Sequence, residues 1–245
     1  MKDVINQAIM GAYLKINLAS DSEDELKAKN LMIKQKTEEL STTLMEEARS
    51  ISNLIKSMEE QHGPNLEPSN MFRVFSYLRL SIVDLHTLNY YLAEEKNENR
   101  QKFLLRSIAL AIFELSEDVH HILGKNFRHS LRHFPNQAEI ISELDKVGKE
   151  FNKFEKEYLS DIKEIRNVTI AHRDKNPVKQ IETLDKLNLI THGIISWMVI
   201  VWFEDFKKVE QLIYMGIAGY RQAKEAAESS GANTNAQADP TAFIT

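Results

Sequence analysis

Residues that form tight turns are scarce in this chain, which has only 8 glycines and 5 prolines among its 245 residues. So few turn signals favour a small number of long secondary-structure elements. Apolar residues recur at spacings of three and four through most of the chain, and no stretch of any length alternates between apolar and polar residues. The sequence therefore predicts an all-α fold, an up-and-down bundle of long helices.

Turn and cap residues divide this helical pattern. Ser20 and Glu23 have the spacing of a capping box at a helix start. Pro177 disfavours helix in the residue before it, so a helix should end at about Asn176. A bend is expected near Gly193 or Gly216 in the last helix. The expected helices span residues 20–61, 71–95, 103–123, 137–172 and 178–227.

We expect three parts in the chain. Residues 1–68 are predicted to form N-terminal helices that pack on a bundle of residues 69–228. Residues 229–245 are rich in Ser, Gly, Ala and Asn and show no periodicity, which predicts a disordered tail. The predicted buried face of the fourth helix is Ile141, Leu144, Val147, Phe151, Phe154, Tyr158, Ile162 and Ile165, and that of the second includes Phe72, Phe75, Leu78, Ile82, Leu85, Leu88, Tyr91 and Leu92.

Charge and cysteine content exclude some classes of protein. A formal net charge of −5 argues against a dedicated nucleic-acid coat protein, although it leaves room for a local basic face. The absence of cysteine excludes disulfides and thiolate metal sites and fits a reducing cytoplasm. No secretory signal is evident, and the most apolar window, Ile194 to Phe203, has about half the length of a membrane span. We therefore expect a cytoplasmic protein with no membrane partner.

The segment from Glu164 to Asp174 brings a guanidinium, an amide and an imidazole to one helix end. Five residues separate Arg166 from His172, which in an ideal α-helix places the two about 120° apart around the axis. His172 continues an apolar stripe and should point into the core or into a symmetry-related partner. Arg166 has a long side chain that can reach around the helix, so the two groups could converge if the helix loosens before the proline.

These residues resemble the signature of HEPN domains (higher eukaryotes and prokaryotes nucleotide-binding). That signature is an Arg, then four to six residues, then a His, often with a polar residue directly after the Arg, the position that Asn167 fills. The run from Ile165 to Asp174 is especially similar to abortive-infection-type HEPN proteins. The all-helical pattern agrees with the family fold of four or five helices. The resemblance covers only about a dozen residues.

The resemblance implies a metal-independent endoribonuclease that works as a homodimer without a cofactor, as a toxin or an antiphage defence effector. His172 would act as general acid or base on the ribose 2′-hydroxyl or the leaving oxygen, Arg166 would hold the scissile phosphate, and Asn167 would orient the pair. A His exchanges protons near neutral pH, and a guanidinium matches a phosphate with two parallel hydrogen bonds. RNA is the expected partner, Arg173 a further RNA contact, and an antitoxin or regulatory protein the expected restraint.

The chain departs from HEPN toxins that pair with nucleotidyltransferase antitoxins, which often carry a Tyr two residues after the His. Asp174 occupies that position, so control by nucleotide transfer to a Tyr is not expected. Asp174 could instead pair with Arg173 or Arg166 and weaken phosphate binding. The alternative is a non-catalytic all-helical interaction or scaffold protein, in which Arg166 and Asn167 serve the helix end and His172 is a hydrogen-bonded core residue.

A basic segment from Lys125 to Phe134 is the second candidate site. Lys125, Arg128 and Arg132 alternate with aromatic residues, a pattern that suits single-stranded RNA through phosphate contacts and base stacking. The alternative, which the sequence favours, is a solvated loop whose two aromatic residues fill the core. The aromatic residues are Phe127 and Phe134.

A metal site is the third candidate. Glu117 and His120 have the Glu-x-x-His spacing of carboxylate-bridged di-iron bundles. Such bundles need a second copy of this motif together with further inward-facing Glu residues. His129 and His133 would share a helix face but have no nearby Glu or Cys. The sequence therefore predicts no metal site.

Overall fold

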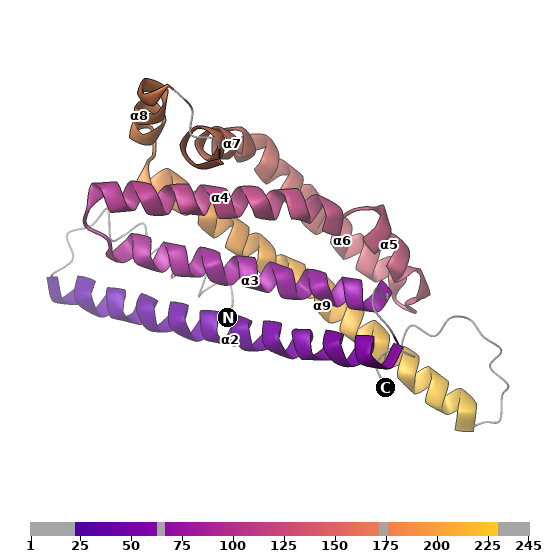
Figure 1. The fold of residues 1–245 in the computed structure, drawn as a ribbon. Helices are drawn as coiled ribbons and strands as arrows, with labels where there is room; N and C mark the ends of the chain where they lie inside the picture. The colour runs from indigo at the N-terminus through magenta and orange to yellow at the C-terminus, as the bar shows by residue number, and fades with distance from the viewer. Residues whose placement is uncertain (1–22, 63–66, 172–175, 230–245) are drawn as a thin grey trace. The chain divides into compact units, whose positions relative to one another are not determined.

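The computed structural model describes residues 23–62, 67–171 and 176–229, and every regular element among them is helical (Figure 1). The predicted all-α helical bundle is therefore confirmed for these residues. Within them, no helix combines the length and the apolarity that a transmembrane span requires. The elements are α2 (Glu23–His62), α3 (Glu67–Glu94), α4 (Glu98–Ile122), α5 (Lys125–Ser130), a 3₁₀ turn (Leu131–His133), α6 (Gln137–Phe154), a π-helical turn (Glu155–Leu159), α7 (Ser160–Arg166), a second π-helical turn (Asn167–Ala171), α8 (Pro177–Asp185) and α9 (Leu189–Ser229).

Asparagine caps set two of these helix starts. Asn97 accepts a hydrogen bond from the backbone N–H of Arg100 (3.1 Å), and α4 begins at the next residue, Glu98, ahead of the predicted start at residue 103. Asn176 accepts from the backbone N–H of Val178 (3.0 Å), and Pro177 follows it as the first residue of α8. An Asn cap satisfies N–H groups that lack intrahelical partners, and a proline at this first position loses no hydrogen bond.

The final helical region is divided at a point that the sequence did not indicate. The prediction of one helix over residues 178–227 is wrong, because α8 ends at Asp185 and α9 begins at Leu189. Between them, the N–H of Leu187 closes a turn onto the carbonyl of Leu184 (3.2 Å), and His192 Nδ1 lies 3.1 Å from the N–H of Asn188. The two glycines proposed as bend sites both lie inside α9.

The described residues form two compact units, each built from three separate stretches of the chain. Unit 1 takes its residues from 1–46, 80–115 and 154–201, and unit 2 takes its residues from 47–79, 116–153 and 202–245. The predicted division of the chain at residue 68 stays a prediction. Residues 1–22 and 230–245, which include nearly all of the predicted tail, lie outside the described part.

Unit 1 has an aliphatic core with a small polar cluster inside it. Helices α3 and α4 are joined by a short turn and run side by side (Figure 1), and α4 contributes much of the core. Buried Asn89 donates to Ser196 Oγ (2.7 Å), and the ring of Trp197 packs edge-on against His86 at 5.7 Å. Buried residues of unit 1 include Ile82, Leu85, Leu105, Ile108, Ile112, Phe113, Ile162, Ile165, Val199 and Ile200.

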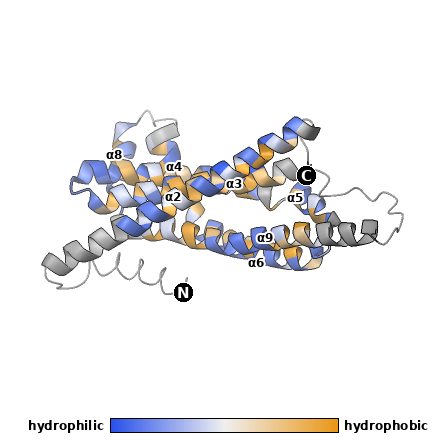
Figure 2. Ribbon diagram, turned by 90° about the horizontal axis from the view of Figure 1, so that it is seen from below, coloured by the Kyte–Doolittle hydropathy of each residue, from blue (hydrophilic) through white to orange (hydrophobic). Residues whose placement is uncertain are grey.

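Unit 2 has a core of aromatic rings with a buried ion pair beside it. The ring of Phe75 contacts those of Phe127 and Phe206 at centroid distances of 6.3 Å and 6.0 Å. The indole N–H of Trp202 donates to the carbonyl of Val147 (3.0 Å). Figure 2 shows that the labelled helices carry both hydrophobic and hydrophilic residues, which agrees with helices that pack on one side.

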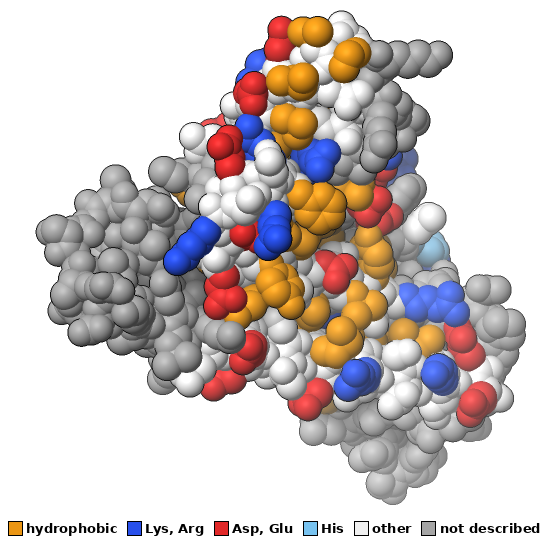
Figure 3. All heavy atoms as spheres, turned by 60° about the vertical axis from the view of Figure 1, so that its left-hand side comes forward, with side chains coloured by type: hydrophobic (Ala, Val, Ile, Leu, Met, Phe, Trp, Pro, Cys, Tyr) orange, Lys and Arg blue, Asp and Glu red, His pale blue; other side chains and the backbone are white. Residues whose placement is uncertain are grey.

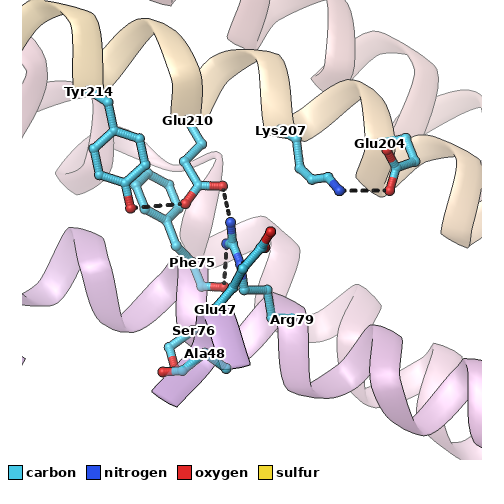
Figure 4. Close-up of polar contacts among 9 residues, drawn as sticks. All are labelled: Glu47, Ala48, Phe75, Ser76, Arg79, Glu204, Lys207, Glu210 and Tyr214. Atoms are coloured by element: carbon cyan, nitrogen blue, oxygen red, sulfur yellow. Dashed lines mark hydrogen bonds and ion pairs between the residues drawn. The ribbon is translucent and has the colours of Figure 1, made fainter. Parts of the chain in front are cut away.

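Arg79 is the centre of the polar network in unit 2 (Figure 4). Its Nη2 donates to Glu210 (2.7 Å), its Nε to Glu47 (2.8 Å) and its Nη1 to the carbonyl of Phe75 (3.2 Å). Burial alone would lower the pKa of Arg79, but the hydrogen bonds and charges of the two carboxylates outweigh it, so this pKa is raised. Tyr214 donates to the second oxygen of Glu210 (3.2 Å).

Glycine is required at one position of α9. A Cβ on Gly216 would collide with the side-chain oxygen of Asn136 and would lie 2.8 Å from Cδ1 of Phe134. Asn136 is held in place, because its amide donates to the carbonyl of Leu212 (2.8 Å). By contrast, a Cβ on Gly219 would meet no atom within 4 Å. Close packing therefore explains the glycine at position 216.

Candidate functional site

The Arg and the Asn of the candidate motif lie together at the end of α7 in unit 1. Arg166 is the last residue of α7, and Asn167 is the first residue of the π-helical turn that follows. Nη1 of Arg166 donates to Oδ1 of Asn167 (3.0 Å), and both residues are half-buried. The predicted role of Asn167 in orienting the Arg is compatible with this geometry, because the hydrogen bond lies in the plane of the guanidinium.

A phenylalanine from α4 supports the same guanidinium. The central carbon of the Arg166 guanidinium lies 4.6 Å from the ring centroid of Phe113, which is 5% exposed. Nε of Arg166 is buried and has no hydrogen-bond acceptor among the described residues. The side chain is therefore fixed by one aromatic face and one in-plane hydrogen bond, while part of its hydrogen-bonding capacity is unused.

The helix widens where the motif begins. Residues Asn167–Ala171 form a π-helical turn, in which hydrogen bonds run from i to i+5, and Thr169 donates its hydroxyl to the carbonyl of Ile165 (2.6 Å). The predicted angle of about 120° between Arg166 and His172 assumed a regular α-helix. That angle does not apply here, because one wide turn separates the two positions. Such turns are frequent at functional sites.

His172, Arg173 and Asp174 lie outside the described residues. The predicted approach of the imidazole to Arg166, the RNA contact by Arg173 and the competing ion pair with Asp174 therefore all stay predictions. What the structure describes is the arginine half of the motif and the turn that leads toward the histidine.

The basic segment of unit 2 has its aromatic residues inside the protein. Phe127 and Phe134 are buried, so these two rings fill the core as the favoured interpretation predicted. The predicted loop is wrong, because the segment forms α5 and the 3₁₀ turn. Arg128 donates to Asp145 (2.7 Å) and to the carbonyl of Leu123 (3.2 Å). Lys125 and Arg132 are exposed, and Arg132 contacts the ring of His129. A role in RNA binding would thus depend on phosphate contacts and not on stacking by these two rings.

The Glu-x-x-His pair on α4 does not face the interior. Glu117 and His120 are both exposed, whereas a di-iron site needs its ligands inside the bundle. Among the described residues, no group of three or more His, Cys, Asp or Glu side chains is placed to hold a metal ion.

Two features of unit 1 were not found from the sequence. Phe113 lies in an apolar stretch of the sequence, and a contact between residues 53 positions apart (166 − 113) leaves no local signal. Tyr91 was expected in the buried face of α3 but is 55% exposed, and together with exposed Phe103 it lines an open depression of about 360 Å³ in unit 1. The depression is also lined by Glu94, Glu95, Arg100 and Leu104.

Comparison with known proteins finds no matching family model, no matching curated protein and no matching solved structure. Function is therefore inferred from the motif residues and from the geometry around Arg166.

Proposed function

We propose that this protein is a HEPN-type, metal-independent endoribonuclease that acts as a homodimer in the cytoplasm, as a toxin or an antiphage defence effector. One observation carries the proposal. Arg166 is a half-buried guanidinium held by Asn167 and Phe113, at the start of a π-helical turn that leads directly to His172. A guanidinium that is oriented in advance is what phosphate recognition requires.

The proposed chemistry needs one base, one acid and one anion-binding group. A base removes the proton of the ribose 2′-hydroxyl, and the resulting oxygen attacks the adjacent phosphorus while the bond to the 5′-oxygen breaks. An acid protonates that leaving oxygen, so the products are a 2′,3′-cyclic phosphate and a 5′-hydroxyl. We assign the proton transfers to His172 and its copy in the second subunit. Arg166 stabilises the charge on the phosphoryl oxygens.

Partners follow from this assignment. RNA is the substrate, because the attacking group is the 2′-hydroxyl that DNA lacks. Arg173, Lys125, Arg128 and Arg132 are proposed RNA contacts, and among them Arg128 has to release or share Asp145 to reach a phosphate. An antitoxin or regulatory protein is proposed to restrain the activity.

The test is cleavage of a single-stranded RNA in the presence of EDTA. Wild-type protein should produce fragments that end in a 2′,3′-cyclic phosphate, whereas His172→Ala and Arg166→Ala should not. His120→Ala and Arg100→Ala are matched controls, because each removes the same chemical group from an exposed position. The proposal would be refuted if the wild-type protein left the RNA intact, or if both motif variants cleaved it as well as the wild type does.

The second candidate function is a non-catalytic interaction module. It is favoured by the exposure of large apolar side chains in unit 1: Leu80, Tyr91, Phe103, Val178 and Ile181. Figure 3 shows one face of the molecule on which hydrophobic side chains gather between acidic and basic ones. Under this alternative, His172→Ala lowers the melting temperature. Neither the wild-type protein nor this variant cleaves RNA. Light scattering tests the homodimer directly, and a monomer at micromolar concentration would exclude the two-subunit site.

A further inference from the structure

The described arginines with buried or half-buried side chains are held in different ways. Arg79 makes hydrogen-bonded ion pairs with two carboxylates, Glu47 and Glu210, and Arg128 makes one with Asp145. Arg166 makes no ion pair with a described carboxylate. Its contacts are a neutral amide and a neutral aromatic ring. A carboxylate would neutralise the positive charge of the guanidinium, whereas the ring of Phe113 contacts the group and leaves its charge in place.

The position of the guanidinium over the ring also decides which donors remain. All five N–H bonds of a guanidinium lie in its plane, so a ring against its face consumes none of them. Asn167 takes one hydrogen from Nη1, and Nε has no acceptor among the described residues although it is buried. A buried donor without an acceptor is unfavourable, and the Nη hydrogens that Asn167 does not take are the donors that an oxyanion could bind.

We propose that Phe113 is a positioning residue, which stacks on Arg166 and presents the edge of its guanidinium to one phosphate of a single-stranded RNA. This inference rests on the proposed ribonuclease function, because it names how the arginine of that site binds the substrate. Phe113 belongs to α4 and is buried, so the ring is itself held firmly by its surroundings. Arg166 would otherwise lose its orientation, since its long side chain has many rotamers.

The first experiment compares Phe113→Leu with Phe113→Tyr. Leucine keeps an apolar side chain but removes the aromatic face, and it should lower kcat/KM for RNA cleavage about tenfold. Tyrosine keeps the face and should retain activity within about twofold. Phe103→Leu is the matched control, because Phe103 is on the same helix and its ring lies 5.6 Å from the guanidinium of Arg106. It should leave kcat/KM unchanged.

The second experiment does not depend on cleavage. In wild-type protein, the Nε–Hε resonance of Arg166 should be shifted upfield by the ring current of Phe113. It should move when a 2′-O-methyl RNA oligonucleotide, which cannot be cleaved, is added. Phe113→Leu should lose the upfield shift and bind the oligonucleotide more weakly, with Phe113→Tyr restoring both.

The outcomes separate the two proposals. Wild-type protein that binds the oligonucleotide through Arg166 but cleaves no RNA would refute the ribonuclease function and leave the role of Phe113 standing. An Arg166 resonance without a ring-current shift would overturn the inference, and so would equal kcat/KM in wild type and Phe113→Leu. If Phe113→Leu does not fold, the inference is decided by the wild-type resonance and by the Phe113→Tyr variant.

Discussion

Replacing Arg79 by methionine should destabilise the protein strongly, because it leaves Glu210 charged and buried. The side chain of Arg79 is 7% exposed and that of Glu210 is 3% exposed, with Nη2 and Oε2 at 2.7 Å. After the replacement, the hydroxyl of Tyr214 remains as a neutral donor to the carboxylate. Breaking such a pair from one side costs about 3–5 kcal/mol, a large share of a total stability of about 5–15 kcal/mol.

Two further variants show that the effect comes from the unpaired charge. The side chain of Glu47 is 41% exposed, so Glu47→Gln should cost only about 0.2–1 kcal/mol. Replacing both Arg79 and Glu210 by methionine removes the pair without leaving a charge behind, and the double variant should be more stable than either single one. The order expected is wild type and double variant first, and the two single variants last.

Urea unfolding followed by far-UV circular dichroism measures these differences. The midpoint should fall for Arg79→Met and Glu210→Met while the slope with denaturant stays constant, as expected for a change in the native state. The reasoning is refuted if Arg79→Met changes the free energy of unfolding by less than about 1 kcal/mol, or if the double variant is less stable than both single variants.

Three other predictions concern unit 2. Gly216→Ala should lower the free energy of unfolding by about 1–3 kcal/mol because of the collision described above, whereas Gly219→Ala should raise it by about 0.5–1 kcal/mol through helix propensity; equal thermal midpoints would contradict this. The pKa of Tyr214 is raised by burial and then by the neighbouring carboxylate, so the corresponding stability is present below pH of about 10 and lost as the pH rises further. Tyr214→Phe should therefore reduce the loss of thermal stability at alkaline pH, and tyrosinate absorbance should show one fewer late-titrating phenol. Trp202→Phe removes the buried hydrogen bond to Val147 and should cost about 1–3 kcal/mol in urea unfolding, and a variant as stable as wild type would show that this bond contributes nothing.

The helical fold could be predicted because its signals are local. The spacing of apolar residues identified the helices, and Asn176 and Pro177 marked a helix boundary through cap chemistry that acts within four residues. The faces were less well predicted where helix geometry changes. Ile141 was expected to be buried, but Ile140 is buried in its place and Ile141 is half-buried. Tyr158, also expected in that face, is half-buried within the π-helical turn Glu155–Leu159.

Only part of the candidate site could be predicted, because only some of its contacts join residues that are neighbours in the sequence. Arg166 and Asn167 are adjacent in sequence, so their hydrogen bond could be foreseen from the motif. The contact with Phe113 could not, since it joins two helices and an aromatic residue in an apolar stripe has no distinguishing pattern. The division between α8 and α9 was missed because neither glycine nor proline occurs at residues 186–188.

The chain from Phe154 to Ala171 contains two π-helical turns, so its geometry depends on the number of residues as much as on their type. A π-helical turn accommodates one residue more than the same stretch of α-helix. Deleting a residue from Glu155–Leu159 would therefore let a regular helix form with little change in length. Because the wide turn absorbs its extra residue, the later side chains would keep about their present directions. Deleting a residue from the regular turns of α6 would instead rotate all later side chains by about 100° about the axis, and Arg166 would leave the ring of Phe113 although no amino acid of the site had been replaced.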